Sequence, residues 1–257
     1  MPESIDLPTP ASALVVVAHP DDAEFQCGAT LAKWARSGCV VHHLVLTDGS
    51  KGTWDPDADQ EALVARRVQE QHRAAELLGA DGEVVMLGSV DGELVADTET
   101  RASVAAVIRR LAPEVILGHD PWRRYRLHPD HAAAGRLVID GIVAARDPFF
   151  HREQLDNGLE VHRPEALLLF EADVVNHHET LDEADVQAKL SALEAHESQM
   201  ETTHFYRIAD DTASDPTTGR DEQLARFRSR QRERLGEVAA SIHHEAAEAF
   251  HLMRDQL

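Results

Sequence analysis

Residues 13–24 read ALVVVAHPDDAE, and this stretch decides the fold that the sequence predicts. An apolar, valine-rich run leads directly into a histidine, a proline and two adjacent carboxylates, and an amphipathic segment follows. A valine run without polar alternation is typical of a strand covered on both faces, as in a parallel sheet. Because ligands bind outside the carboxyl ends of such strands, we expect the His-Pro-Asp-Asp turn to lie where the protein binds and reacts.

The turn itself has two interpretations. His19 and Asp22 are three residues apart where strand passes into helix, so an imidazole and a carboxylate can converge on one point. Asp21 adds a second carboxylate, and two neighbouring negative charges are costly in a partly buried turn unless a cation such as zinc compensates them. Alternatively, Asp21 or Asp22 is simply the N-cap of the next helix, with Glu24 in its first turn.

The rest of the chain repeats the alternation of strand and helix. We expect further strands at 39–46, 83–87, 114–118, 164–170 and 172–176, and helices at 24–37, 60–78, 98–111, 132–145, 182–198 and 222–253. This order predicts parallel βαβ units. The predicted fold is α/β, Rossmann-like and three-layered, with a mostly parallel sheet. It forms one domain over residues 1–257, with an N-terminal tail at 1–11 and a helical C-terminal cap at 222–253.

Composition excludes several classes of function. The 257 residues carry a formal net charge of -21, which disfavours nucleic acid and anionic membranes as partners. No apolar run has the length of a transmembrane helix, and residues 1–10 lack the features of a signal peptide, so we expect a soluble, cytoplasmic protein without stable membrane insertion. Cys27 and Cys39 lack CxxC spacing and are predicted to be reduced core thiols. The sequence is compatible with a homo-oligomer.

A second polar motif follows the strand predicted at 114–118. It contains His128-Pro129-Asp130-His131, in which two histidines three residues apart can face one site at the start of a helix. In the helix at 60–78, Arg67 and Glu70 fall toward the apolar side. They are interpreted either as a buried ion pair or, for Arg67, as a sugar- or anion-binding residue.

With both motifs in view, the chain resembles the PIG-L or LmbE-like family of zinc-dependent N-deacetylases. Residues 18–24 (AHPDDAE) match the first family signature and residues 128–131 (HPDH) match the second. Supporting matches are Thr47-Asp48-Gly49, Arg67-x-x-Glu70, Lys189-x-x-Ala192-Leu193-x-x-His196-x-Ser198-Gln199, and Glu248-Ala249-Phe250. Gln26 and Ala29 stand where relatives often have glycines, and the arginine-rich segment 122–126 is not part of the general pattern.

The resemblance implies a function and a set of roles. It implies a zinc-dependent hydrolase that uses metal-activated water to remove acetyl from an N-acetylated amino sugar of the N-acetylglucosaminyl type. His19, Asp22 and His131 are the implied ligands of zinc, for which Fe2+ is a possible substitute. The implied catalytic residues are Asp21 as general base, His128 as oxyanion stabiliser or acid, and Asp130 orienting His128, while Arg67 binds the sugar. Alternatives are an amidase of a sugar-thiol conjugate with the same metal site and a non-catalytic sugar-binding relative.

Overall fold

The computed structural model describes residues 4–204, 219–255 and 257. Within this part of the chain, eight strands form one sheet in the order β1-β7-β8-β6-β5-β2-β3-β4. The strands are β1 (Ser4–Ile5), β2 (Ser12–Val17), β3 (Val40–Thr47), β4 (Val84–Ser89), β5 (Val115–His119), β6 (Ala166–Phe170), β7 (His177–Thr180) and β8 (Ala247–Met253). Only β8 runs antiparallel to its neighbours, so the sheet is mostly parallel, as predicted.

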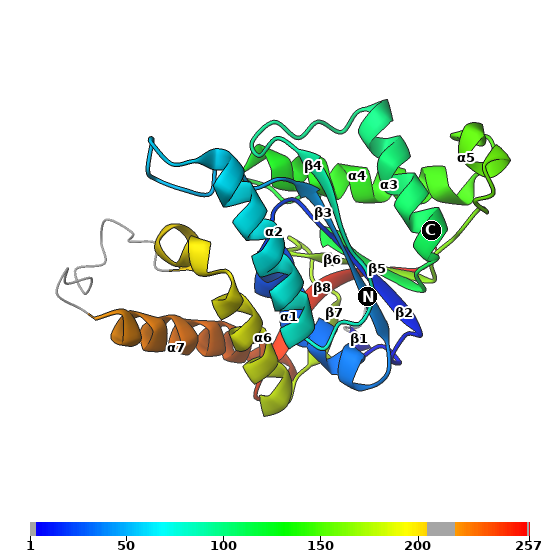
Figure 1. Ribbon diagram of the computed structural model, residues 1–257. Helices are drawn as coiled ribbons and strands as arrows, with labels where there is room; N and C mark the ends of the chain where they lie inside the picture. Colours follow the sequence, from blue (N-terminus) through cyan, green and yellow to red (C-terminus); the bar gives the residue numbers. More distant parts are fainter. Residues whose placement is uncertain (1–3, 205–218, 256) are drawn as a thin grey trace.

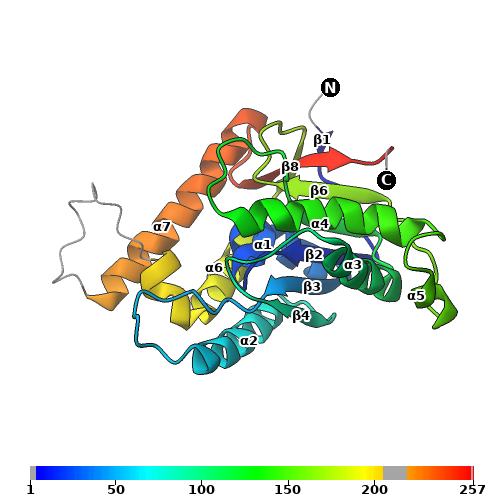
Figure 2. The same ribbon diagram turned by 90° about the horizontal axis from the view of Figure 1, so that it is seen from above.

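Helices cover both faces of the sheet (Figure 1). They are α1 (Asp22–Arg36), α2 (Gln60–Leu77), α3 (Thr98–Leu111), α4 (Pro129–Arg146), α5 (Arg152–Asp156), α6 (Glu183–Ala195) and α7 (Arg220–Ala239). Helices α3 and α4 lie on one face, and α1, α2 and α6 on the other. Helix α7 packs beside α6 and β8 at the periphery, as Figure 2 shows from above. The predicted three-layer α/β fold is therefore confirmed.

The opening valine run explains why both faces are covered. Val15 and Val17 contribute to the core beneath α1, which also contains Trp34. Val16, between them, contributes to the opposite core, with Ile108 of α3. All three valines are fully buried, because successive side chains of a strand point to opposite faces. One uninterrupted apolar run thus serves two cores.

The structure differs from the prediction in three places. The prediction of a helix over 222–253 is wrong at its end, because the helix stops at Ala239 and residues 247–253 form β8 in the middle of the sheet. The strand predicted at 172–176 lies at 177–180, where it pairs with β1 from the predicted tail. The short helix α5 lies between the helix predicted at 132–145 and the strand predicted at 164–170, where no helix was predicted.

Two features from the composition can be followed in the structure. Cys27 and Cys39 are buried free thiols, as predicted. None of the helices in the described part of the chain combines the length and the apolar character that crossing a membrane requires.

Candidate active site and metal centre

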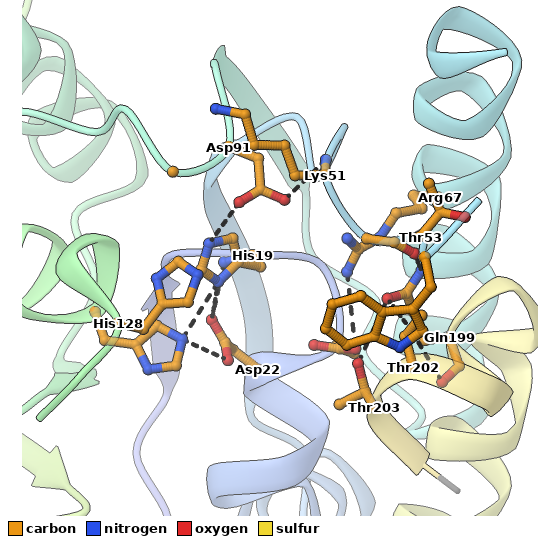
Figure 3. Close-up of a pocket in the computed structure, with 15 residues that line it drawn as sticks. His19, Asp22, Lys51, Thr53, Arg67, Asp91, His128, Gln199, Thr202 and Thr203 are labelled. Atoms are coloured by element: carbon orange, nitrogen blue, oxygen red, sulfur yellow. Dashed lines mark hydrogen bonds and ion pairs between the residues drawn. The ribbon is translucent and has the colours of Figure 1, made fainter. Parts of the chain in front are cut away.

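The two sequence motifs meet in one cavity at the carboxyl edge of the sheet. The cavity has a volume of about 350 Å³, and its walls come from loops after β2, β3, β4 and β5, from α2, and from the segment after α6. Its lining residues are His19, Asp21, Asp22, Lys51, Gly52, Thr53, Trp54, Arg67, Asp91, Gly92, His128, His131, Gln199, Thr202 and Thr203. Figure 3 shows His19, Asp22 and His128 on one side and Arg67, Gln199 and Thr202 on the other.

The three predicted metal ligands converge. The Nδ1 atom of His19 lies 3.3 Å from Oδ2 of Asp22 and 3.3 Å from Nε2 of His131, and Nε2 of His131 lies 3.3 Å from Oδ1 of Asp22. Ligands about 2.0–2.1 Å from a tetrahedral zinc ion are about 3.3–3.4 Å apart. The donor types and their spacing therefore fit a small divalent metal ion.

The backbone around Asp21 explains how these atoms are held. Asp21 adopts a left-handed conformation with φ of 93°, which is costly for a residue with a Cβ. Its N–H donates to Oε1 of Gln71 at 3.1 Å, and Oδ2 of Asp22 accepts the N–H of His19 at 2.8 Å. Asp21 occupies the N-cap position of α1, but its side chain makes no capping hydrogen bond. The alternative that Asp21 is only a helix cap therefore finds no support.

Asp21 is a buried carboxylate with an unused oxygen. Its Oδ2 has no hydrogen-bond partner among the residues that the structure describes, and the guanidinium of Arg67 lies 3.7 Å away. Burial raises the pKa of Asp21 to about 6, with a contribution from Asp22 and against the opposing effect of Arg67 and His196. The group can therefore exchange a proton near neutral pH.

The second ring nitrogen of His19 is also held. Its Nε2 lies 3.1 Å from Oδ2 of Asp130 and 3.3 Å from Oδ1 of Asp91. Burial disfavours a charged imidazole, but hydrogen bonds to Asp22 and Asp91 outweigh it and raise the pKa of His19 to about 11. A carboxylate that accepts the Nε2 proton leaves Nδ1 as the ligand atom, the usual arrangement for a metal-binding histidine.

These contacts correct the role predicted for Asp130. Its Oδ2 also accepts the N–H of Gly92 at 2.6 Å, and its Oδ1 accepts the N–H of Leu94 at 3.2 Å. Within the described chain no hydrogen bond joins Asp130 to His128, so Asp130 holds His19 and the loop after β4 instead. The HPDH motif does not reveal this, because Asp130 and His19 are 111 positions apart.

His128 is exposed at the edge of the same cavity. Its ring centroid lies 4.6 Å from that of His19 and 5.0 Å from that of His131. Burial of part of the ring, followed by the electrostatic effect of the neighbouring His19 and His131 imidazoles, lowers its pKa. The structure thus brings His128 to the predicted metal ligands but leaves it free of hydrogen bonds to other described residues.

Arg67 and Glu70 do not pair with each other, so that interpretation is wrong. Arg67 donates to the carbonyl oxygens of Gly49 at 2.9 Å and Pro20 at 2.6 Å. Glu70 instead accepts hydrogen bonds from Arg66 and from both the N–H and the hydroxyl of Ser198. Arg67 is 3% exposed and lines the cavity, which leaves the binding interpretation of this residue standing.

Besides Asp91, two further buried residues near the predicted metal ligands had no predicted catalytic or ligand role. His119, at the end of β5, stacks on His131 and places its Nε2 3.4 Å from Oδ2 of Asp22. Glu24 is fully buried and contacts Gln71 at 2.9 Å and His196 at 3.2 Å. Their places in the sequence could have indicated both residues. His119 directly follows the strand predicted at 114–118, and Glu24 comes shortly after the His-Pro-Asp-Asp turn.

The arginine-rich segment 122–126 reaches the site through its last residue. The guanidinium nitrogen Nη1 of Arg126 lies 2.9 Å from Nδ1 of His131, and Nη2 lies 2.6 Å from Oε2 of Glu171. An arginine can only donate, so Nδ1 of His131 accepts in this arrangement. If His131 bound a metal ion through Nε2, its ring proton would be on Nδ1, and Nδ1 could then no longer accept from this guanidinium.

Comparison with known proteins places this geometry in context. A protein-family model described as GlcNAc-PI de-N-acetylase (PIG-L) matches residues 14–142. Diacetylchitobiose deacetylase of Thermococcus kodakarensis is 38% identical over 187 residues, which cover 72% of this chain and 69% of that protein. 4-Oxalmesaconate hydratase of Pseudomonas putida is 34% identical over 166 residues, covering 60% of this chain and 62% of that protein.

The fold also resembles a solved structure over nearly its whole length. N,N'-Diacetylchitobiose deacetylase from Pyrococcus horikoshii superimposes with a TM-score of 0.81 at 27% sequence identity. The match covers 97% of this chain and 87% of the other. The likeness therefore extends past the matched family region to the segments after α4, which supply Lys189, His196 and Glu248.

Proposed function

The chain belongs to the PIG-L family, and from this premise we propose that it is a metal-dependent hydrolase that removes the acetyl group from an N-acetylated amino sugar. One observation carries the proposal. The candidate ligand nitrogens of His19 and His131 lie 3.3 Å apart, and each lies 3.3 Å from a different carboxylate oxygen of Asp22. The same cavity contains a buried carboxylate oxygen of Asp21 that has no described hydrogen-bond partner. Metal-assisted hydrolysis of an amide uses both a metal site and a general base.

Zinc is the metal that we propose for these ligands. Two imidazole nitrogens and one carboxylate leave a further position open in a tetrahedral zinc site, and ferrous iron accepts the same donors. Zinc at this site would lower the pKa of a water molecule and polarise the acetyl carbonyl. Asp130 and Asp91 fix the orientation of His19. The burial of these two carboxylates and that of Asp22 favours a bound cation.

The proton transfers are assigned to Asp21 and His128. Asp21 takes a proton from the attacking water, because its raised pKa of about 6 keeps it ionised at neutral pH and still basic. His128 stabilises the tetrahedral oxyanion and gives a proton to the departing amine. Its lowered pKa makes the protonated imidazole a better acid. We expect kcat/KM to depend on pH as a bell, with two apparent pKa values that belong to the coupled site.

The cavity walls support an amino sugar with a further group attached. Arg67 faces the cavity opposite His19 and is proposed to bind sugar hydroxyls (Figure 3). A second cavity of about 470 Å³ shares Thr53, Trp54 and Thr202 with the first. Trp54 is 72% exposed between the two and can stack on a sugar ring. A disaccharide or another glycoside of N-acetylglucosamine is therefore the preferred substrate class.

The test is the release of amine and acetate from a panel of acetylated sugars. The panel contains N-acetylglucosamine, N,N'-diacetylchitobiose and an N-acetylglucosaminyl inositol, each assayed after chelation and after zinc or ferrous iron is restored. We expect metal-restorable release that Asp21→Asn lacks. The matched control is Asp81→Asn, an exposed carboxylate before β4 at the opposite edge of the sheet. Metal binding without release of amine and acetate from any panel member would refute the deacetylase proposal.

Two further arms separate the alternatives. An amide of a sugar-thiol conjugate is added to the panel, and its cleavage in the absence of deacetylation would assign the amidase. A non-catalytic sugar-binding protein would bind the sugars, measured by calorimetry, and release no amine. The hydratase similarity is tested by a spectrophotometric assay with 4-oxalmesaconate, the compound in the name of that relative.

A further inference from the structure

Helix α1 is broken one turn after the metal ligand Asp22. Cys27 has φ of -146° and ψ of 16°, which are not helical values, and regular helix resumes beyond it. An unbroken helix would join the N–H of Ala29 to the carbonyl oxygen of Phe25. The break separates a short segment, residues 22–26, which we call the site turn, from the body of the helix at residues 28–36.

A buried ion pair occupies the break. Nζ of Lys189 donates to the carbonyl oxygen of Phe25 at 2.8 Å and to Oε1 of Glu248 at 2.6 Å. The same Oε1 accepts the N–H of Ala29 at 3.2 Å, and Oε2 accepts the N–H of Thr30 at 2.8 Å. Lysine and glutamate therefore stand between the two groups that one helical hydrogen bond would have joined.

The pair is placed there by two distant elements. Lys189 comes from α6 and Glu248 from β8, and both side chains are 3% exposed. Gly28 lies at the break, where an added Cβ would come within 3.4 Å of Cγ of Lys189. The glutamate also lies at the N-terminal end of residues 28–36, where the helix dipole favours a negative charge. Lys189 and Glu248 bond to each other and to the backbone groups that the break leaves without a helical partner. These bonds offset the cost of burying the two charges.

The break sets the direction of the site turn. Asp22 supplies a proposed metal ligand, and Glu24 is held by Gln71 and His196 on its other side. Gln71 in turn accepts the N–H of Asp21. If α1 closed its own hydrogen bond between Phe25 and Ala29, the site turn would have to rotate against these contacts.

We propose that Lys189 and Glu248 are positioning residues that keep α1 broken, so that Asp22 stays in register with His19 and His131. The inference rests on the proposed function, because it assigns the metal centre as the feature that is positioned. It also accounts for two sequence matches, at Lys189 and Glu248, to which the metal ligands and the proton transfers give no role. A merely structural ion pair would act on stability alone.

The test compares Lys189→Met, Glu248→Leu and the double variant Lys189→Met/Glu248→Leu. Each single variant leaves one buried charge unpaired, so it should lower the melting temperature sharply. The double variant removes both charges and lets Ala29 bond to Phe25 directly. We expect it to regain most of the lost melting temperature, yet to bind zinc at least 10-fold more weakly than the wild type and to show a lower kcat when saturated with metal.

The readouts are zinc affinity by competition with a chromogenic chelator, melting temperature, and the absorption spectrum of the cobalt-substituted protein. Arg109→Met, which weakens the distant contact of α3 with the end of α4, serves as a destabilised control with unchanged zinc affinity. The proposal is overturned if the double variant regains both stability and zinc affinity, or if the wild type binds no metal. If the wild type binds zinc and cleaves no acetamide, only the proposed activity fails, and zinc affinity and cobalt spectrum still decide the positioning role.

Discussion

Replacing Asp130 by asparagine will weaken metal binding more than it weakens catalysis by the metal-loaded protein. In the structure Oδ2 of Asp130 accepts from Nε2 of His19 at 3.1 Å and from the N–H of Gly92 at 2.6 Å, while Oδ1 accepts from the N–H of Leu94 at 3.2 Å. The side-chain oxygen of the new asparagine will take the place of Oδ2, which accepts from two donors. Its amide nitrogen then faces the N–H of Leu94, which is left without an acceptor.

The magnitudes follow from these contacts. One buried donor left unpaired costs about 1–3 kcal/mol, which lowers the melting temperature by about 2–12 °C for a chain of this size. Loss of a carboxylate partner to a metal-binding histidine weakens metal affinity about 10–100-fold. Because Asp91 remains 3.3 Å from the same nitrogen of His19, we expect zinc affinity to fall by the lower end of this range, about 10-fold. In the Asp91→Asn/Asp130→Asn double variant, the loss of zinc affinity should approach about 100-fold.

The assay is competition for zinc between the metal-free protein and a chromogenic chelator at pH 7.5. Asp120→Asn is the matched control, since Asp120 is another buried carboxylate. Among the residues that the structure describes, its side chain accepts only the backbone N–H groups of Trp122 and Asp173. It should lose stability and keep its zinc affinity. Unchanged zinc affinity in Asp130→Asn, together with a lower kcat and a shifted pH profile, would refute the reasoning and show that Asp130 acts through His128.

Three further predictions follow from single contacts. Asp21→Asn should abolish activity and stabilise the metal-free protein at pH 7.5 by about 1–3 kcal/mol, because the folded pKa of about 6 lies above the unfolded value of 3.8. Calorimetry should show this gain shrinking below pH 6 and vanishing near pH 4, whereas an equal gain at both pH values would contradict it. Gly52→Ala should lower kcat/KM at least ~10-fold, since the new Cβ collides with the guanidinium of Arg67 and crowds Gln199; Gly219→Ala, where the space is open, should not. Arg109→Met should cost about 3 kcal/mol, because six hydrogen bonds from Arg109 to residues 144–154 are lost, while kcat per folded molecule stays the same in titrated kinetics.

The sequence predicted those parts of the fold that depend on local patterns. The valine run of β2 and its polar turn indicate a strand buried on both faces, and the structure places Val15, Val16 and Val17 accordingly. Strand β8 was missed because residues 247–253 follow a long charged helix. Its contacts come from β6 and β7, far away in the sequence. A segment that is stabilised by such distant pairing has no local period to reveal it.

Within the site, the sequence predicted which side chains meet and missed how they are supported. The spacing of His19 and Asp22 and of His128 and His131 brings each pair to one strand end. Which carboxylate then accepts the second proton of His19 depends on how the loop after β4 packs. The same limit explains the error for Arg67 and Glu70: their helical spacing allows an ion pair, but nearby carbonyl groups and Ser198 offer better partners.

The supporting contacts share one target, the segment from His19 to Thr30. Asp130 holds the ring of His19, Gln71 holds the backbone of Asp21, and Glu24 links that glutamine to His196. Lys189 and Glu248 hold the break that follows. A strained residue and a broken helix in a single turn would relax if left alone. Distant elements of the chain therefore stabilise a local geometry that its own sequence disfavours, and this geometry places Asp21 beside three candidate ligand atoms.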